Sequence, residues 1–338
     1  MKFNDNPLFV ERVAQLNTAL AAVHPDTLAT DDGDSWPLVL KLGSSRSGST
    51  VFLQWIASLG SFAYPSNFLS LFPQAPVVGA RLFELITNPR YRYNHEFDDI
   101  AGAIAFDSVS GKTRGLRAPN EFWQFWLAYF DFPEVPVSDG AWLERGDFGR
   151  FNRDVSALTR EFNRPFVLKA HHLGPYLEVV APSVSNAVYL HMHRDPVDVV
   201  SSVIAARVTR YGDLDHFFGW RPREFELLRD LDIHRQVAGQ VYFNERSILD
   251  RRTALGHRYL SFSYETFCAD PQSVHRQMVA LVNRHSPEPL DAQYRGPERF
   301  APSRCDDPAE RAAIEHALAY WTSEYGELRY DDPPPGAE

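Results

Sequence analysis

Residues 38–60, LVLKLGSSRSGSTVFLQWIASLG, constrain the fold more than any other part of the chain. The segment starts with five almost continuously apolar residues, as expected for a strand covered on both faces of a sheet. Gly43 and Gly48 then bracket four residues, and apolar residues at helical spacing follow as far as Gly60. A buried strand, a glycine loop and a helix in this order are typical of an α/β protein that binds an anion where the helix begins.

The loop departs from the Walker A phosphate-binding pattern at one position. Ser49 stands where that pattern has lysine, and Arg46 lies inside the loop instead. Gly48 allows the backbone to approach an anion closely, Ser47, Ser49 and Thr50 add hydroxyl donors, and the Arg46 guanidinium can donate to two oxygens at once. Without the lysine, magnesium-assisted transfer of a γ-phosphoryl group is the less favoured use. The alternative is a serine- and glycine-rich turn that binds no ligand.

Three further apolar runs have the character of strands. They comprise residues 165–171, 187–194 and 258–264, and each is followed by turn residues and a helical pattern. This alternation predicts an α/β fold with a central, mostly parallel β-sheet flanked by helices.

We interpret the 338 residues as one domain, 1–338, with a core of about 36–60 and 165–285. Residues 61–163 are rich in proline and aromatic side chains and lack clear periodicity, so we interpret them as an insertion. The tail 331–338 is expected to be disordered. An amphipathic helix is predicted near the N-terminus from the spacing of Phe9, Val13, Leu16, Leu20 and Val23.

The charge and composition exclude some classes of function. A net charge of -10 argues against a dedicated binder of nucleic acid or anionic membranes, so any anionic ligand must meet a local group of cations. Cys268 and Cys305 form neither a disulfide framework nor a metal-binding spacing. No run of eighteen apolar residues occurs and the N-terminus does not read as a signal peptide, so we expect a soluble, cytoplasmic protein. The composition leaves a homodimer open.

The segment HRDPVDVVSS places a second cation near the loop. Asp195 is predicted to cap a helix whose first residue is Pro196. Arg194 then closes the preceding strand at the carboxyl edge of the sheet, where open α/β sheets bind ligands. Ser202 returns to the same helix face two turns after the cap. Taken alone, an arginine before such a helix is more often an ordinary surface residue.

Lys169, His171 and His172 end another predicted strand at the same edge. A histidine there can act as a general base, although a hydrogen-bonded structural role is commoner for any single histidine. With His191 and His193 these residues also suggest a zinc site. No cysteine, glutamate or third histidine completes a compact ligand pattern, so we expect no metal.

Together, these motifs resemble the cytosolic-type sulfotransferases, which use 3′-phosphoadenosine 5′-phosphosulfate (PAPS). Residues 46–50, RSGST, are similar to the family's loop for the 5′-phosphosulfate. Arg194 and Ser202 match the ends of the family's segment for the 3′-phosphate, and Lys169-Ala170-His171 is similar to its catalytic Lys-Thr-His. The segment SFSYETF is similar to a family strand that places Tyr264 beside the adenine.

The resemblance implies a P-loop-like fold and sulfuryl transfer to a hydroxyl or amine. His171 would accept the acceptor's proton, while Arg46 and Lys169 would stabilise the departing phosphate, with no metal required. The RSGST form is closer to prokaryotic and carbohydrate-acting members, which favours a bacterial protein and a carbohydrate or glycolipid acceptor. Two rivals remain: an ATP-dependent P-loop kinase, and a nucleotide-binding protein of the same fold without activity.

The chain also departs from the family pattern. Val51 stands where many members place an adenine-stacking tryptophan, and Arg295-Gly296 is only a partial match to a segment near the C-terminus that completes the 3′-phosphate site. Residues 120–134, NEFWQFWLAYFDFPE, are expected to form an aromatic helix. Such a helix belongs most often to the core, with a wall of the acceptor site as the alternative.

Overall fold

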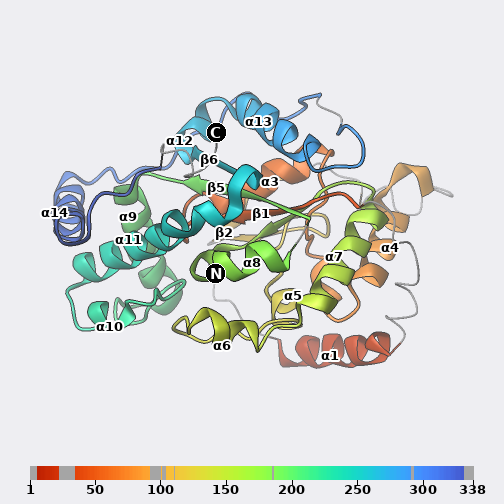
Figure 1. The fold of residues 1–338 in the computed structure, drawn as a ribbon, viewed down its shortest axis with the longest axis horizontal. Coiled ribbons are helices and arrows are strands. Elements are labelled where there is room, and N and C mark those ends of the chain that lie inside the picture. Colours follow the sequence, from red (N-terminus) through yellow and green to blue (C-terminus); the bar gives the residue numbers. More distant parts are fainter. Residues whose placement is uncertain are drawn as a thin grey trace.

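A four-stranded parallel sheet organises the structure (Figure 1). The computed structural model describes residues 6–22, 35–91, 100, 104–109, 111–184, 186–290 and 293–330. The strands follow the order β4-β1-β5-β6. Their bounds are Leu38–Leu42 for β1, Phe166–Lys169 for β4, Ala187–His193 for β5 and Tyr259–Ser263 for β6. The predicted α/β class, with a parallel sheet flanked by helices, is confirmed.

Helices make up most of the remaining regular structure. The α-helices are α1 (Pro7–Ala21), α3 (Ser49–Leu59), α4 (Pro76–Thr87), α5 (Trp123–Leu127), α6 (Asp139–Leu143), α7 (Phe148–Phe162), α8 (Leu177–Ser183), α9 (Pro196–Tyr211), α10 (Phe225–Leu228), α11 (Ile233–Arg251), α12 (Tyr264–Ala269), α13 (Pro271–Asn283) and α14 (Pro308–Tyr325). The short 3₁₀ helices are η1 (Leu69–Leu71), η2 (Pro89–Tyr91), η4 (His171–Tyr176) and η5 (Arg252–Arg258). A small antiparallel pair joins β2 (Ser108–Val109) to β3 (Lys112–Thr113).

The two faces of the sheet bury different groups of helices. Leu40 of β1 packs on one face with side chains of α4, α7 and α8. Val39, its neighbour, packs on the other face with side chains of α3 and α13. Because side chains alternate along a strand, a strand covered on both faces must be apolar at nearly every position, which explains the LVLKL run.

The helix starts follow the predicted capping chemistry. The side chains of Asp195, Asp270 and Asp307 accept hydrogen bonds from backbone N–H groups in the first turns of α9, α13 and α14. Each of these helices begins with a proline. N–H groups in the first turn of a helix make no intrahelical hydrogen bond, so the absence of an N–H on proline costs nothing there. The strand-to-helix junctions are thus determined by local sequence.

The N-terminal helix forms as predicted, but its apolar stripe does not provide the main anchor. Phe9 is 54% exposed and Leu16 is 41% exposed. The buried residue is Asn17, whose side chain donates to the backbone oxygen of Leu71 and accepts from the N–H of Gln74. A polar contact therefore fixes α1, which the apolar spacing could not indicate. Val23 and the tail 331–338 lie outside the described residues.

The aromatic segment forms a much shorter helix than its length suggests. Phe122 adopts a left-handed backbone conformation, with φ of 57°, and α5 spans five residues. The interpretation as core is nevertheless correct for most of its side chains. Those buried are Phe122, Phe125, Trp126, Tyr129 and Phe130. Within the described residues, no helix is both long and apolar enough to cross a lipid bilayer.

Candidate functional site

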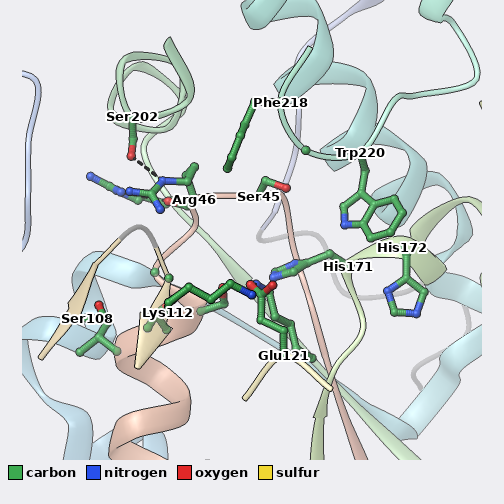
Figure 2. A pocket seen from close by; sticks show the side chains of 18 of the residues that line it. Ser45, Arg46, Ser108, Lys112, Glu121, His171, His172, Ser202, Phe218 and Trp220 are labelled. Carbon is green, nitrogen blue, oxygen red and sulfur yellow. Dashed lines mark hydrogen bonds and ion pairs between the residues drawn. The ribbon is translucent and has the colours of Figure 1, made fainter. Parts of the chain in front are cut away.

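The carboxyl ends of all four parallel strands meet at one cavity of about 660 Å³ (Figure 2). The loop after β1, the His171 segment after β4, Arg194 after β5 and Tyr264 after β6 all reach it. The predicted site residues that line the cavity are Arg46, Gly48, Ser49, Thr50, Lys169, His171, Arg194, Ser202 and Tyr264. Ser47 is the exception, because its side chain is buried beneath the loop.

Two glycines set the shape of the loop. Gly43 and Gly48 have φ values of 126° and 88°, a region that other residues rarely adopt. A Cβ atom on Gly48 would lie 2.4 Å from the ring of Tyr264, and one on Gly43 would lie 2.5 Å from the carbonyl oxygen of Met192. Close packing therefore adds to the conformational requirement at both positions.

Two arginines meet on one side of the cavity. The Nε of Arg46 donates to the hydroxyl of Ser202 over 2.9 Å, and Nη1 of Arg194 donates to the backbone oxygen of Arg46 over 3.0 Å. Arg194 also lies 4.9 Å above the ring of Tyr264. Burial and the nearby Arg194 lower the pKa of Arg46. Within the described chain neither guanidinium forms an ion pair with a carboxylate, so an anion would relieve their mutual repulsion.

His171 is held in one tautomer. Its Nδ1 pairs with the carbonyl oxygen of Gly43. A carbonyl can only accept, so Nδ1 carries the hydrogen and Nε2 keeps a free lone pair. Burial lowers the pKa of His171 well below its ordinary value, and the charge of Lys169 acts in the same direction. Nε2 is buried and has no hydrogen-bond partner among the described residues.

Glu121, which the sequence did not indicate, faces the catalytic lysine candidate. Its carboxylate forms an ion pair with Nζ of Lys169. Burial acts to raise the pKa of Glu121, but the attraction of Lys169, with smaller contributions from Lys112 and Arg210, outweighs it and holds the pKa below the ordinary value. The pair restrains Lys169 at the wall of the cavity, which both residues line.

The other side of the cavity is aromatic. Figure 2 shows Arg46 and Ser202 on one side, His172 and Trp220 on the other, and His171 and Glu121 between them. Four rings surround His172, with centroids 4.5 to 5.5 Å from its own: Trp123, Trp126, Phe132 and Trp220. Burial, followed by the charge of Lys169, lowers the pKa of His172 to about 3. His172 is therefore neutral at physiological pH.

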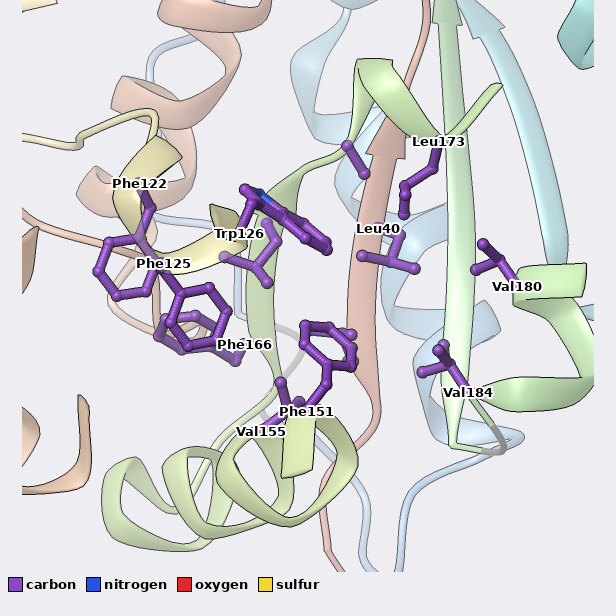
Figure 3. Close-up of a cluster of buried hydrophobic side chains, with 14 of the residues drawn as sticks. Leu40, Phe122, Phe125, Trp126, Phe151, Val155, Phe166, Leu173, Val180 and Val184 are labelled. Carbon is purple, nitrogen blue, oxygen red and sulfur yellow. The ribbon is translucent and has the colours of Figure 1, made fainter. Parts of the chain in front are cut away.

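The aromatic segment contributes side chains both to the cavity wall and to the core. Trp123 and Trp126 line the cavity, while Phe125 and Trp126 belong to the buried cluster that packs against Phe151 of α7 (Figure 3). Trp220 comes from the segment between α9 and α10, where no sequence pattern indicated a functional residue.

A buried carboxylate fixes the loop from below. Glu245 of α11 accepts from the N–H of Ser44 over 2.7 Å and pairs with His191 over 2.8 Å. His191 in turn contacts the hydroxyl of Tyr259 over 2.7 Å. His191 is therefore engaged beneath the sheet edge, and the described residues contain no group of three or more His, Cys, Asp or Glu arranged to hold a metal ion.

Lys41 is the least expected polar residue near the loop. It lies within β1, is fully buried, and donates from Nζ to the hydroxyl of Ser47 over 2.9 Å. Burial lowers its pKa well below the ordinary value, and the charge of Lys169 adds to the effect. The strand LVLKL gave no indication of this contact because it was interpreted from its apolar residues.

The C-terminal part of the chain also reaches the cavity. Nη2 of Arg194 donates to the backbone oxygen and hydroxyl of Ser303, and the N–H of Cys305 donates to Asp198 over 2.8 Å. Arg295 instead lines a separate cavity beside Trp36. The segment near Ser303, rather than Arg295, is therefore the part of the C-terminal region that contacts Arg194.

The comparisons with known proteins yield only distant structural likenesses. No protein-family profile and no curated protein matches the chain. Sulfotransferase STF9 from Mycobacterium avium aligns with a TM-score of 0.45 and 16% identity, over 96% of this chain and 79% of its own. Sulfotransferase STF1 from Mycobacterium tuberculosis H37Rv aligns with a TM-score of 0.46 and 16% identity, over 89% and 75%.

A third solved structure, the sulfotransferase domain from the curacin biosynthetic pathway, aligns with a TM-score of 0.40 and 15% identity, over 90% of this chain and 95% of its own. All three of these similar structures are sulfotransferases. At this distance the likeness decides nothing about activity, so the chemistry of the site must be inferred from its own residues.

Proposed function

We propose that the protein is a sulfotransferase that moves a sulfuryl group from PAPS to a hydroxyl or amine of an acceptor. The observation that carries the proposal is the shared cavity: the glycine loop, two arginines without a carboxylate partner and a neutral histidine with a free Nε2 all border it. The combination suits a donor with two anionic groups next to an acceptor whose proton must be removed.

The donor would occupy the side of the cavity that Arg46 borders. The N–H groups at the start of α3, the hydroxyls of Ser49 and Thr50, and the guanidinium of Arg46 would bind the 5′-phosphosulfate. Arg194 and Ser202 would bind the 3′-phosphate. Tyr264, which packs against Gly48 and under Arg194, would contact the adenine.

The reaction is a single in-line displacement. The acceptor oxygen or nitrogen forms a bond to sulfur while the bond from sulfur to the bridging phosphate oxygen breaks. The acceptor proton moves to Nε2 of His171, a contribution of about 10²- to 10⁴-fold. The electron pair of the broken bond stays on 3′-phosphoadenosine 5′-phosphate (PAP), where Arg46 and Lys169 stabilise its charge.

The acceptor would enter along the aromatic side of the cavity. Trp123 and Trp220 lie close together there, with ring centroids 5.0 Å apart, beside His172. Aromatic faces stack on the apolar faces of sugars and other rings, which supports a carbohydrate or glycolipid acceptor as the first to test. The segment 61–163 supplies Glu121, Trp123 and Trp126, so we include it with the core in one functional domain.

The first experiment measures thermal stability of the purified protein with different nucleotides. A ligand that binds the native state raises the melting temperature by mass action. We expect PAP to raise it without magnesium, and 5′-AMP, which lacks the 3′-phosphate, to have little effect. A rise with ATP and magnesium but not with PAP would overturn the proposal in favour of a kinase.

Turnover requires a second measurement. With PAPS and a panel of sugars, glycolipids and other alcohols or amines, we expect formation of PAP and of a sulfated product together. Binding of PAP without turnover on any acceptor would instead indicate a nucleotide-binding protein that lacks the reaction.

A further inference from the structure

A lysine lies concealed directly beneath the proposed donor loop. Lys41 has no exposed surface, and its Nζ donates to Ser47, a loop residue, over 2.9 Å. A Cβ atom built on Gly43 would lie 3.4 Å from the same Nζ. The amine of Lys41 therefore lies close to Gly43, where the loop begins, and is hydrogen-bonded to Ser47 within it.

Burial and the charge of Lys169 disfavour a positive charge on Lys41. Lys169, its neighbour in register on β4, repels an ammonium ion, and His171 is neutral. Glu245 of α11 attracts it, but that carboxylate already binds Ser44 and His191. Among the described residues, Lys41 forms no ion pair, and its pKa lies well below the ordinary value of a lysine.

An anion in the loop would favour the protonated form of Lys41 over the neutral form. A buried ammonium that has no carboxylate partner is costly, so the protein without a bound anion favours the neutral amine. A phosphosulfate held by the loop N–H groups would bring negative charge to the other side of Ser47 and Gly43. Charges interact strongly through a buried environment, because little water is present to screen them.

We propose that Lys41 binds a proton when the donor enters and thereby supplies a concealed positive charge to the donor loop. This inference rests on the proposed function, because it assumes that the loop holds the phosphosulfate. Lys41, which belongs to strand β1 beneath the loop, would then supply the positive charge that the lysine of a Walker loop supplies from the loop itself. Lys41 is a positioning residue that acts through Ser47 and does not touch the reacting atoms.

The direction of the pH dependence follows from linkage. The pKa of Lys41 is low in the empty protein and higher when the anion is bound, so binding takes up a proton between these two values. Donor affinity must therefore decrease as pH rises through that window. For one linked proton, the limiting slope is about tenfold in dissociation constant per pH unit.

Isothermal titration calorimetry with PAP tests this directly. At pH 8 the phosphates of PAP are fully ionised, because the second pKa of a phosphate ester is about 6. Titrations in two buffers with different ionisation enthalpies give the number of protons taken up. We expect net uptake that approaches one proton for the wild type and none for Lys41→Met.

Matched variants separate this role from general effects of charge or folding. Lys112→Met removes an exposed lysine from the wall of the same cavity and should leave proton uptake unchanged, because the proposed uptake belongs to the buried amine beneath the loop. Lys41→Gln keeps a polar group beside Ser47 without a titrating amine, and serves if the methionine variant does not fold. It should also abolish uptake and weaken PAP binding roughly tenfold or more.

The titrations distinguish failure of the donor assignment from failure of the role proposed for Lys41. Failure of wild-type protein to bind PAP at all would reject the donor assignment. Tight binding of PAP with no proton uptake by the wild type, or equal uptake by wild type and Lys41→Gln, would overturn the role of Lys41 and leave the donor assignment intact.

Discussion

At the residue scale, the free Nε2 of His171 is the feature most specific to acid–base chemistry. Replacing His171 with alanine should lower kcat by about 10²- to 10⁴-fold, because it removes the proposed acceptor of the substrate's proton. PAP affinity should change little, because the proposed donor contacts are made by other residues. Steady-state kinetics and PAP titration measure the two quantities.

His172→Ala is the matched control for that change. His172 is equally buried, with 7% of its surface exposed, but four aromatic rings surround it. We expect this variant to raise KM for the acceptor more than it lowers kcat. Equal losses of kcat in the two variants would contradict the assignment of His171 as the base.

Gly48 offers a second test at the same scale. Gly48→Ala should lower the free energy of unfolding by about 1–3 kcal/mol, because it combines a positive φ with a clash against Tyr264. Gly60→Ala, where φ is 75° and no atom lies within 4 Å of the added Cβ, should show the smaller cost of backbone strain alone. Urea denaturation measures both.

A double variant isolates the clash. With Tyr264→Ala present, Gly48→Ala should cost less than it does in the wild type, since the ring no longer occupies the space. Strictly additive losses of unfolding free energy would show that the ring of Tyr264 moves aside at no cost. The requirement for glycine at position 48 would then be purely conformational.

At the scale of elements, the contact between α11 and the loop couples stability to pH. Burial acts to raise the pKa of Glu245, but His191 and Ser44 outweigh it and hold the pKa below the ordinary 4.5. The resulting stability is present above pH 4.5 and is lost as pH falls through the lower pKa of the folded state. At pH 7, Glu245→Gln should cost about 1.5–3 kcal/mol.

The pH dependence of the difference in stability between wild type and Glu245→Gln tests this assignment. Denaturation of wild type and Glu245→Gln at pH 7 and in acid should show a difference that narrows as pH falls below 4.5. A difference in unfolding free energy that stays constant with pH would mean that the charge of Glu245 does not contribute to stability and that the shape of its side chain alone fixes the loop.

The elements also show what the sequence can predict. The strands, the capped helices and the segments at the strand ends follow from local patterns, so the loop, His171, Arg194 and Tyr264 could be placed at one edge before the structure was known. Glu245, Trp220 and Ser303 could not, because they reach the loop or the cavity from segments with no strand or glycine motif. Their positions depend on long-range packing, which periodicity does not encode.

At the scale of the whole molecule, the donor would connect segments that are far apart in the chain. PAP should slow amide hydrogen exchange together in residues 43–50, 194–202 and 303–305, since Arg194 contacts both Arg46 and Ser303. Helix α1 serves as the internal control, because its anchor is Asn17 and lies away from these contacts. Protection confined to 43–50 would contradict a donor site shared by the three segments.

Three of the seven tryptophans, Trp123, Trp126 and Trp220, line the cavity on the side opposite Arg46. Indole emission responds to local polarity and to nearby quenchers, so the wall that would hold the acceptor is also an optical reporter that needs no label. Compounds could be screened by intrinsic fluorescence in the presence of PAP, with Trp220→Phe to identify the responding ring. The search for an acceptor therefore need not begin with an assay for its sulfated product.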